Sequence, residues 1–416
     1  MNSDNLEAMI KLGARLVLIT LACLFVIGIA VSMKQQNLEN VDGVSSNGLA
    51  IQSDAFTKAE LIGKTDCPML SKPIPDWVET LAGSAKLEPV SGSFYPGTQG
   101  LVGSADGTAL ITLHSREKQS VRMHDLRSYR ILNNLELDIN AAGVTRLDAD
   151  AHGTPMFILT NYDQPTVTLI DANLTSVRTL KLPNVFQNLV GIATIQGDFA
   201  VLPSRSHRVV GFLSAGEVPS LQIVPVELDD DIFSGSAIPY GVAVIRGCIV
   251  LNYREDRKLA VGRLSVKGVI ITKVFDTDLD HPQSMAVNNE RLYVLETGSH
   301  SLLVYDFVSQ RRHRILLPKG AFRGMTVTQS GEVFVSGQKF DEAEKNNTNF
   351  NSVLDENKVG IYKVLGTRRL THTLGHQTPV PERESFGNSH LDRRPQTLAL
   401  KLWSPMGPLN SLFLSN

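Results

Sequence analysis

The segment Met285–Tyr305, MAVNNERLYVLETGSHSLLVY, aligns without a gap with Ile192–Phe212, IATIQGDFAVLPSRSHRVVGF. Apolar residues occupy matching positions in both segments, in short runs that are separated by polar turns. Runs of this length, bounded by Gly, Pro, Asn, Asp or Ser, are typical of β-strands that are joined in hairpins. The two segments are therefore copies of one β-rich repeat.

The same repeat recurs along most of the chain. Its six copies are 40 to 50 residues apart and begin at residues 101, 147, 192, 242, 285 and 325. This spacing matches that of four-stranded propeller blades. A single copy cannot bury both faces of its sheet, whereas blades stacked around an axis can. The repeat therefore predicts an all-β fold, a six-bladed β-propeller over residues 97–374.

The openings of two predicted inner strands carry similar sequences, PYGVAV at Pro239–Val244 and PQSMAV at Pro282–Val287. Together with the hairpin sequence RLYVLETGSHSLLVYDF, they resemble the NHL-type six-bladed propellers. The resemblance implies the architecture alone, because this superfold hosts both binding proteins and enzymes. The openings VTRLDA and LVGIAT lack the proline. A seven-bladed ring, with a divergent blade from residues 50–96 or 376–416, is the structural alternative.

An uncharged segment near the N-terminus, Leu16–Met33, reads LVLITLACLFVIGIAVSM and lies between Arg15 and Lys34. At about 1.5 Å per helical residue it nearly crosses a bilayer core. The basic residues that precede it place residues 1–15 in the cytoplasm. We expect a transmembrane signal-anchor helix in an inner or plasma membrane, with the propeller in the periplasm or an equivalent extracytoplasmic space.

A secretory signal peptide is the alternative for this segment, because Ala30–Ser32 resembles a cleavage site of small residues. In that case the protein is secreted. The polar, turn-rich residues 34–96 are expected to form a stalk, and residues 375–416 a C-terminal extension.

Composition is that of an ordinary folded protein, with 42% hydrophobic residues, 20% charged residues and a formal net charge of −2. These values argue against a disordered chain and against a basic nucleic-acid binder. Outside the apolar segment the cysteines are Cys67 and Cys248. The sequence leaves open whether the two thiols pair, because their separation in space is unknown.

The usual catalytic signatures are absent from the sequence: it has no GxSxG elbow, HExxH helix, CxxC pair or phosphate-binding glycine loop. The residues that enter the predicted inner strands are Gln99, Thr145, Val190, Tyr240, Gln283 and Arg323. None is a carboxylate, so they make a poor cage for a calcium ion. We therefore expect no cofactor and a non-enzymatic protein. The alternative is a hydrolase or lactonase with a metal ion in the central tunnel.

Basic residues recur in the predicted fourth strands. Charge on an exposed outer strand prevents edge-to-edge pairing, and it also attracts anionic lipid. These residues are Arg178, Lys181, Arg311, Arg312, Arg314, Arg368 and Arg369.

One face of the predicted ring carries the openings of the inner strands and the turns between second and third strands. We name it the loop face. Binding sites tend to lie on loops held by a rigid scaffold, and Arg and Tyr are enriched in binding hot spots. We expect this face to bind a protein or small-molecule ligand, as a binding or scaffold module. The candidate residues are Tyr240, Arg323, Gln283, Gln99, Arg254, Arg257, Arg205, His207, His300 and Arg116.

Overall fold

The computed structural model describes the repeats and parts of the segment before them. The described residues are 50–51, 67, 77–90, 98–104, 106–114, 119–147, 156–175, 177–195, 197–214, 219–228, 233–265, 270–341 and 359–366. Among these residues no helix is long and apolar enough to cross a membrane. The predicted anchor 16–33, its flank 1–15 and the extension 375–416 lie outside the described residues.

The first three blades follow the first three repeats, each with four antiparallel strands numbered from the inside outward. Blade one contains β4 (Thr98–Gly103), β5 (Ala109–His114), β6 (Ser120–Asp125) and β7 (Ile131–Glu136). Blade two contains β8 (Ala141–Leu147), β9 (Met156–Asn161), β10 (Thr166–Asp171) and β11 (Val177–Lys181). Blade three contains β12 (Ala193–Ile195), β13 (Phe199–Pro203), β14 (Val209–Ser214) and β15 (Ser220–Glu227), preceded by the short 3-10 helix η1 (Asn184–Phe186).

Blade four follows the fourth repeat, whereas blades five and six each add a strand from the segment before the first repeat. Blade four contains β16 (Gly241–Ile245), β17 (Cys248–Tyr253), β18 (Lys258–Leu264) and β19 (Ile270–Asp276). Blade five contains β20 (Pro282–Asn288), β21 (Arg291–Glu296), β22 (Ser301–Asp306) and β23 (Arg311–Leu316), with β2 (Val78–Ser84) parallel to β23. Blade six contains β24 (Gly320–Val327), β25 (Val333–Lys339) and β26 (Val359–Leu365), and β3 (Lys86–Pro89) is its outermost strand.

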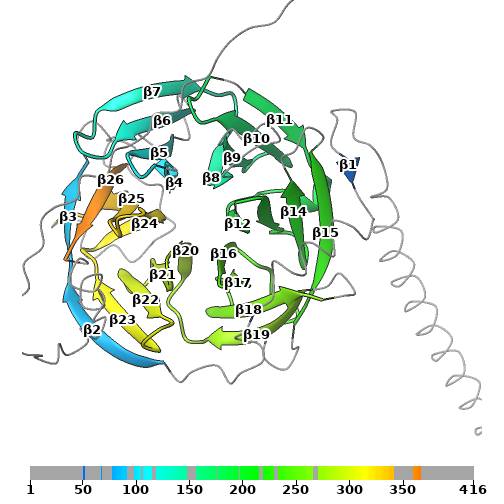
Figure 1. Cartoon of the computed structure of the whole chain (residues 1–416). Coiled ribbons are helices and arrows are strands. Elements are labelled where there is room, and N and C mark those ends of the chain that lie inside the picture. Colours follow the sequence, from blue (N-terminus) through cyan, green and yellow to red (C-terminus); the bar gives the residue numbers. More distant parts are fainter. Residues whose placement is uncertain are drawn as a thin grey trace, which may run out of the picture. The chain divides into compact units, whose positions relative to one another are not determined.

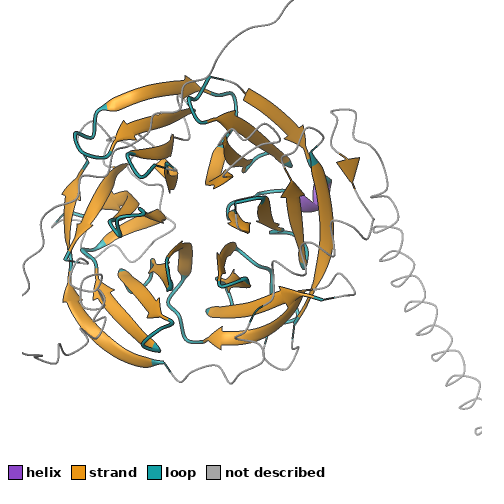
Figure 2. Ribbon diagram, in the orientation of Figure 1, coloured by secondary structure: helices purple, strands orange, loops and turns teal. Residues whose placement is uncertain are grey.

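The blades form a closed ring around a central axis, and almost every regular element is a strand (Figures 1 and 2). Each inner strand contacts the inner strands of both neighbouring blades, in the order β4, β8, β12, β16, β20, β24 and back to β4. The six blades confirm the predicted all-β six-bladed propeller. The seven-bladed alternative is wrong for residues 78–89, because β2 and β3 complete the edges of blades five and six.

The ring is closed by residues from both ends of the repeat region. β26 ends the described part of the last repeat, and β3, which precedes the first repeat, pairs antiparallel with it. β2 and β3 both lie within residues 34–96, which we expected to form a stalk, and they complete the outer edges of blades five and six. The predicted fourth strand of the last repeat, residues 368–374, lies outside the described residues.

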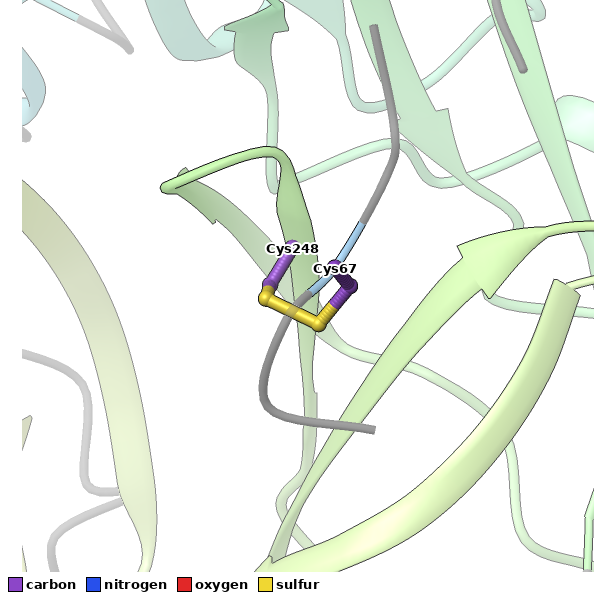
Figure 3. The surroundings of a disulfide bond; sticks show 2 residues. All are labelled: Cys67 and Cys248. Carbon is purple, nitrogen blue, oxygen red and sulfur yellow. A yellow bond between two sulfur atoms is a disulfide. The ribbon is translucent and has the colours of Figure 1, made fainter. Parts of the chain in front are cut away.

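The N-terminal strap, defined as residues 50–51, 67 and 77–90, contacts blades three to six, and its strands β1, β2 and β3 lie at the outer edges of blades three, five and six (Figure 1). Its β1 (Ala50–Ile51) pairs in parallel with β15. Cys67 forms a disulfide with Cys248 of β17 (Figure 3), which answers the pairing question that the sequence leaves open. Trp77 packs edge-on against Phe275, Tyr305 and Phe307, between blades four and five.

Two basic residues on the outer strand of blade five are covered by the strap. Arg312 and Arg314 both pair with Glu79 of β2, at 2.5 and 3.0 Å. Arg314 also pairs with the buried Glu296 at 2.5 Å, and Arg312 with Asp276 at 2.5 Å. In this blade the basic outer strand therefore anchors the strap instead of guarding a free edge.

The hydrophobic core is divided among the blade interfaces, since each strand buries side chains against the neighbouring sheets. The largest cluster joins blades three and four and includes Phe212 and Tyr253. The first and last blades meet through Leu101, Leu110 and Phe334, with Val90 of the strap. Close packing at every interface fixes the positions of the inner strands around the axis.

Gly143 of the inner strand β8 lies very close to the backbone that leads into β12 of the next blade. A methyl group on it would lie 2.1 Å from the carbonyl oxygen of Val190 and 3.0 Å from Oγ1 of Thr160. We therefore expect Gly143→Ala to lower the free energy of unfolding by about 1–3 kcal/mol, as overpacking does. Urea denaturation measures this change. Gly235→Ala is the matched control, because nothing lies within 4 Å of its added carbon, and equal effects at both sites would contradict the packing argument.

Candidate functional site

A cavity of about 440 Å³ lies along the axis of the ring. The inner strands of all six blades line it, from the level of Gly100, Gly143, Gly191 and Gly241 to that of Ser104 and Gln329. Its size falls within the range of small-molecule sites. The loop face therefore opens on a preformed cavity.

Tyr240 is the centre of a cluster at the loop-face end of this cavity. The guanidinium carbon of Arg205 lies 4.4 Å from the centroid of the Tyr240 ring, and that of Arg254 lies 5.2 Å from it. Arg205 also lies 6.0 Å from the ring of Tyr162. Both distances to Tyr240 are in the range of cation–π attraction. We name Tyr162, Arg205, Tyr240 and Arg254 the Arg–Tyr cluster.

Backbone pairing fixes the position of Tyr240 at the start of the inner strand of blade four. Its N–H donates to the carbonyl oxygen of Asn252 at 2.7 Å. The buried side chain of Asn252 in turn donates to the carbonyl oxygen of Pro282 at 2.8 Å, which joins blades four and five. Gln283 of blade five donates to the Tyr240 hydroxyl at 2.6 Å. Four blades, from two to five, therefore contribute to this part of the loop face.

The structure brings together five of the ten candidate residues around the cavity mouth. Gln283 and Arg323 line the cavity itself, and Tyr240, Arg205 and Arg254 lie beside it. The inner strand of blade two begins at Ala141, so Ala142 lies at the opening of the cavity and Thr145 lies farther along its wall. The side chain of Gln99 and all of Arg116 lie outside the described residues.

The other candidates have local structural partners. Arg257 donates from Nε to the carbonyl oxygen of Leu279 at 2.7 Å. His207 is exposed, with Nδ1 2.9 Å from Ser206 Oγ. Nδ1 of His300 lies 3.0 Å from the carbonyl oxygen of Gly320. Partial burial lowers the pKa of His300. The two histidines belong to blades three and five.

No carboxylate is among the described residues that line the cavity. The described part of the chain also contains no group of three or more His, Cys, Asp or Glu residues that are placed to hold a metal ion. Hard cations such as calcium take several oxygen ligands, which carboxylates, carbonyl groups and water supply.

Arg146 is a cavity residue that the repeat alignment does not identify. It lines the cavity wall from β8, the inner strand of blade two. A signal is present in the sequence AAGVTRL, where a single charged residue interrupts an otherwise uncharged inner strand. Because the alignment placed Thr145 at the strand opening, Arg146 was assigned no role.

Two buried histidines in blade one were also not anticipated. Nε2 of His114 and Nε2 of His124 lie 2.7 and 3.2 Å from Thr112 Oγ1. Burial, with a smaller effect of the positive charge on Arg122, lowers the pKa of His114 to about 3. Burial also lowers the pKa of His124. Both imidazoles are therefore neutral in the folded protein at ordinary pH.

These histidines should make the fold sensitive to acid. Below about pH 6.5 the unfolded chain binds protons at His114 and the folded chain does not, so stability falls as the pH falls from about 6.5 toward 3. We expect the free energy of unfolding to be about 2 kcal/mol lower at pH 5 than at pH 7, measured with urea. His114→Gln should reduce this difference; an unchanged pH dependence would assign it to other groups.

The known proteins that resemble this chain share its fold. No protein-family model matches this chain, and no curated protein matches it. The structure of streptogramin B lyase is similar at 14% identity and a TM-score of 0.46, with 67% of this chain and 98% of that chain covered. The structure of regucalcin, a calcium-binding protein from Agrobacterium tumefaciens, gives 10% identity, a TM-score of 0.47 and coverages of 69% and 96%. The structure of a nidogen/laminin complex is similar at 12% identity and a TM-score of 0.42, with 53% of this chain and 81% of that chain covered. The chain is a six-bladed β-propeller, and these neighbours include both enzymes and binding proteins.

Proposed function

We propose that this chain is a non-enzymatic β-propeller that binds a protein or small-molecule ligand at the loop face. The observation that carries the proposal is the Arg–Tyr cluster, in which two guanidinium groups flank the ring of Tyr240. Arg and Tyr supply much of the binding energy in protein interfaces, because each combines a large contact area with polar groups. A binding site is therefore the role that suits this surface.

The cluster is ordered before any ligand arrives. Tyr240 is held by its backbone bond to Asn252 and by the donor group of Gln283. Stacking on the Tyr240 ring restricts the Arg205 and Arg254 side chains, which would otherwise lose rotamer entropy on binding. Preorganisation of this kind strengthens binding without added contact area.

In this proposal the propeller lies outside the cytoplasm and is anchored to a membrane through residues 16–33. The disulfide Cys67–Cys248 supports the location, because disulfides persist in oxidising compartments such as the periplasm and the extracellular space. The uncharged sequence of residues 16–33 supports the anchor. N-terminal sequencing of the mature protein tests the anchor. An N-terminus before residue 16 supports it, whereas an N-terminus close after Ser32 would mean that the segment is cleaved and the protein secreted.

Loss of the cavity-mouth side chains should weaken ligand binding. A partner is first identified by affinity capture with the full-length protein from a native extract. Tyr240→Ala combined with Arg323→Ala should then weaken its binding by about 1–4 kcal/mol, measured by surface plasmon resonance. Ser330→Ala, on the opposite face, is the control. Unchanged affinity in a folded double variant, with loss in the control variant, would place the site on the other face.

A further inference from the structure

The described part of the cavity wall carries positive charge and no negative charge. Arg146 and Arg323 line the cavity, and none of the other described lining residues is Lys, Asp, Glu or His. The six inner strands contain no Asp or Glu at all. Charges of one sign in a concave site with walls of low dielectric constant raise the local concentration of ions of the opposite sign.

The two arginines lie near opposite ends of the cavity. Arg146 pairs across the sheet with Phe157, close to the end of β8 that is farther from the loop face, since Ala141 at the other end pairs with Asn161 beside the loop-face turn. Arg323 lies three residues from Gly320, which pairs with Lys339 on the loop-face side. At about 3.3 Å per residue, their backbone positions differ along the axis by on the order of 10 Å.

The remaining polar groups of the wall are mostly amides and hydroxyls. Gln283 and Thr145 line the same cavity, as do Asn288 and Asn289 near its far end. Amide N–H and hydroxyl groups donate hydrogen bonds to oxyanions, and the planar guanidinium group matches carboxylate and phosphate oxygens in pairs. The wall therefore carries polar groups along its length between two positive charges, and the amides of Gln283 and Asn288 already donate to the Tyr240 hydroxyl and to the carbonyl oxygen of Thr328.

We infer that the axial cavity binds a small oxyanion, a molecule that carries carboxylate or phosphate groups and contacts Arg323 at the loop-face end and Arg146 at the far end. A divalent metal ion is disfavoured there, because the two guanidinium groups repel it and the described wall offers no carboxylate. This site shares Arg323 with the loop-face site and extends from there along the axis to Arg146. It does not depend on the loop-face partner.

Isothermal titration calorimetry with the full-length protein tests the inference. The probes are citrate and pyrophosphate, with triethyl citrate as the uncharged analogue and calcium chloride as the cation, all in a buffer of low salt. We expect saturable binding of at least one anion at one site per chain, and none for the uncharged analogue or for calcium. Arg146→Gln and Arg323→Gln should each weaken that binding by about tenfold, the value of one hydrogen-bonded charge.

Arg178→Gln is the matched control, because it removes the same charge from the exposed outer strand β11 of the blade that carries Arg146. Equal weakening in the control, or no saturable binding of either anion, would overturn the inference. If anion binding fails while the loop face still captures its partner, the inference is wrong and the proposed function stands. If the anion binds while no partner is captured, the inference stands and the proposed function is wrong.

Discussion

A chain that begins at Thr98 should fail to form the closed ring, although it retains every repeat. It lacks β3, the outermost strand of blade six, and β2, whose Glu79 pairs with Arg312 and Arg314. Blade six is then left with the described strands β24, β25 and β26, and the contact of Val90 with the first and last blades is lost. Circular dichroism during heating should show no cooperative transition, because ring closure couples the blades.

A chain that begins at residue 45 is the control for this truncation. It keeps the strap and removes the predicted anchor, so it should be soluble and all-β, with a cooperative transition. A chain from Thr98 with the same melting temperature as this control would show that β3 does not close the ring. A mainly helical spectrum for the control would contradict the propeller itself.

Local patterns predicted most of the ring, because each repeat carries its own hairpins. The alternating residues of RLYVLE and SLLVYD identify two strands and their turn without any distant contact. The closing strand β3 reads KLEP, which is too short and too polar to show a period. Its partner β26 is more than 250 residues away in the sequence, as the register of Lys86 with Leu365 shows. Long-range pairing of this kind leaves no local signal.

The candidate site was predictable where the repeat frame holds. Tyr240, Gln283 and Arg323 follow from strand openings that align well, and the structure places them together at the cavity mouth. Blade two departs from the frame, because Ala142, and not Thr145, lies beside Gly100 of blade one at the cavity mouth. The alignment therefore placed Thr145 at the opening of this blade and gave Arg146 no role. The stacking of Arg205 and Arg254 on Tyr240 joins two blades, so no single repeat encodes it.

The disulfide of the strap makes the stability of the fold depend on the redox state of its compartment. Cys67 lies outside the repeats and is bound to Cys248 in the second strand of blade four, 181 residues later. Both cysteines are buried beside Ala243 and Ile245, in the core between blades four and five. The bond therefore ties the strap to the ring between its contact with blade three and its contacts with blades five and six.

Removal of this disulfide should lower stability substantially. A crosslink that closes a loop of 181 residues restricts the unfolded chain, so Cys67→Ser combined with Cys248→Ser should lower the free energy of unfolding by about 2–5 kcal/mol, measured with guanidinium chloride. Dithiothreitol should destabilise the wild-type protein by a similar amount and leave the double variant unchanged. Equal stability of the oxidised and reduced wild-type protein would mean that β2, β3 and Trp77 hold the strap without the bond. The structure favours the opposite result, because both sulfur atoms lie in a packed interface that the strap itself completes.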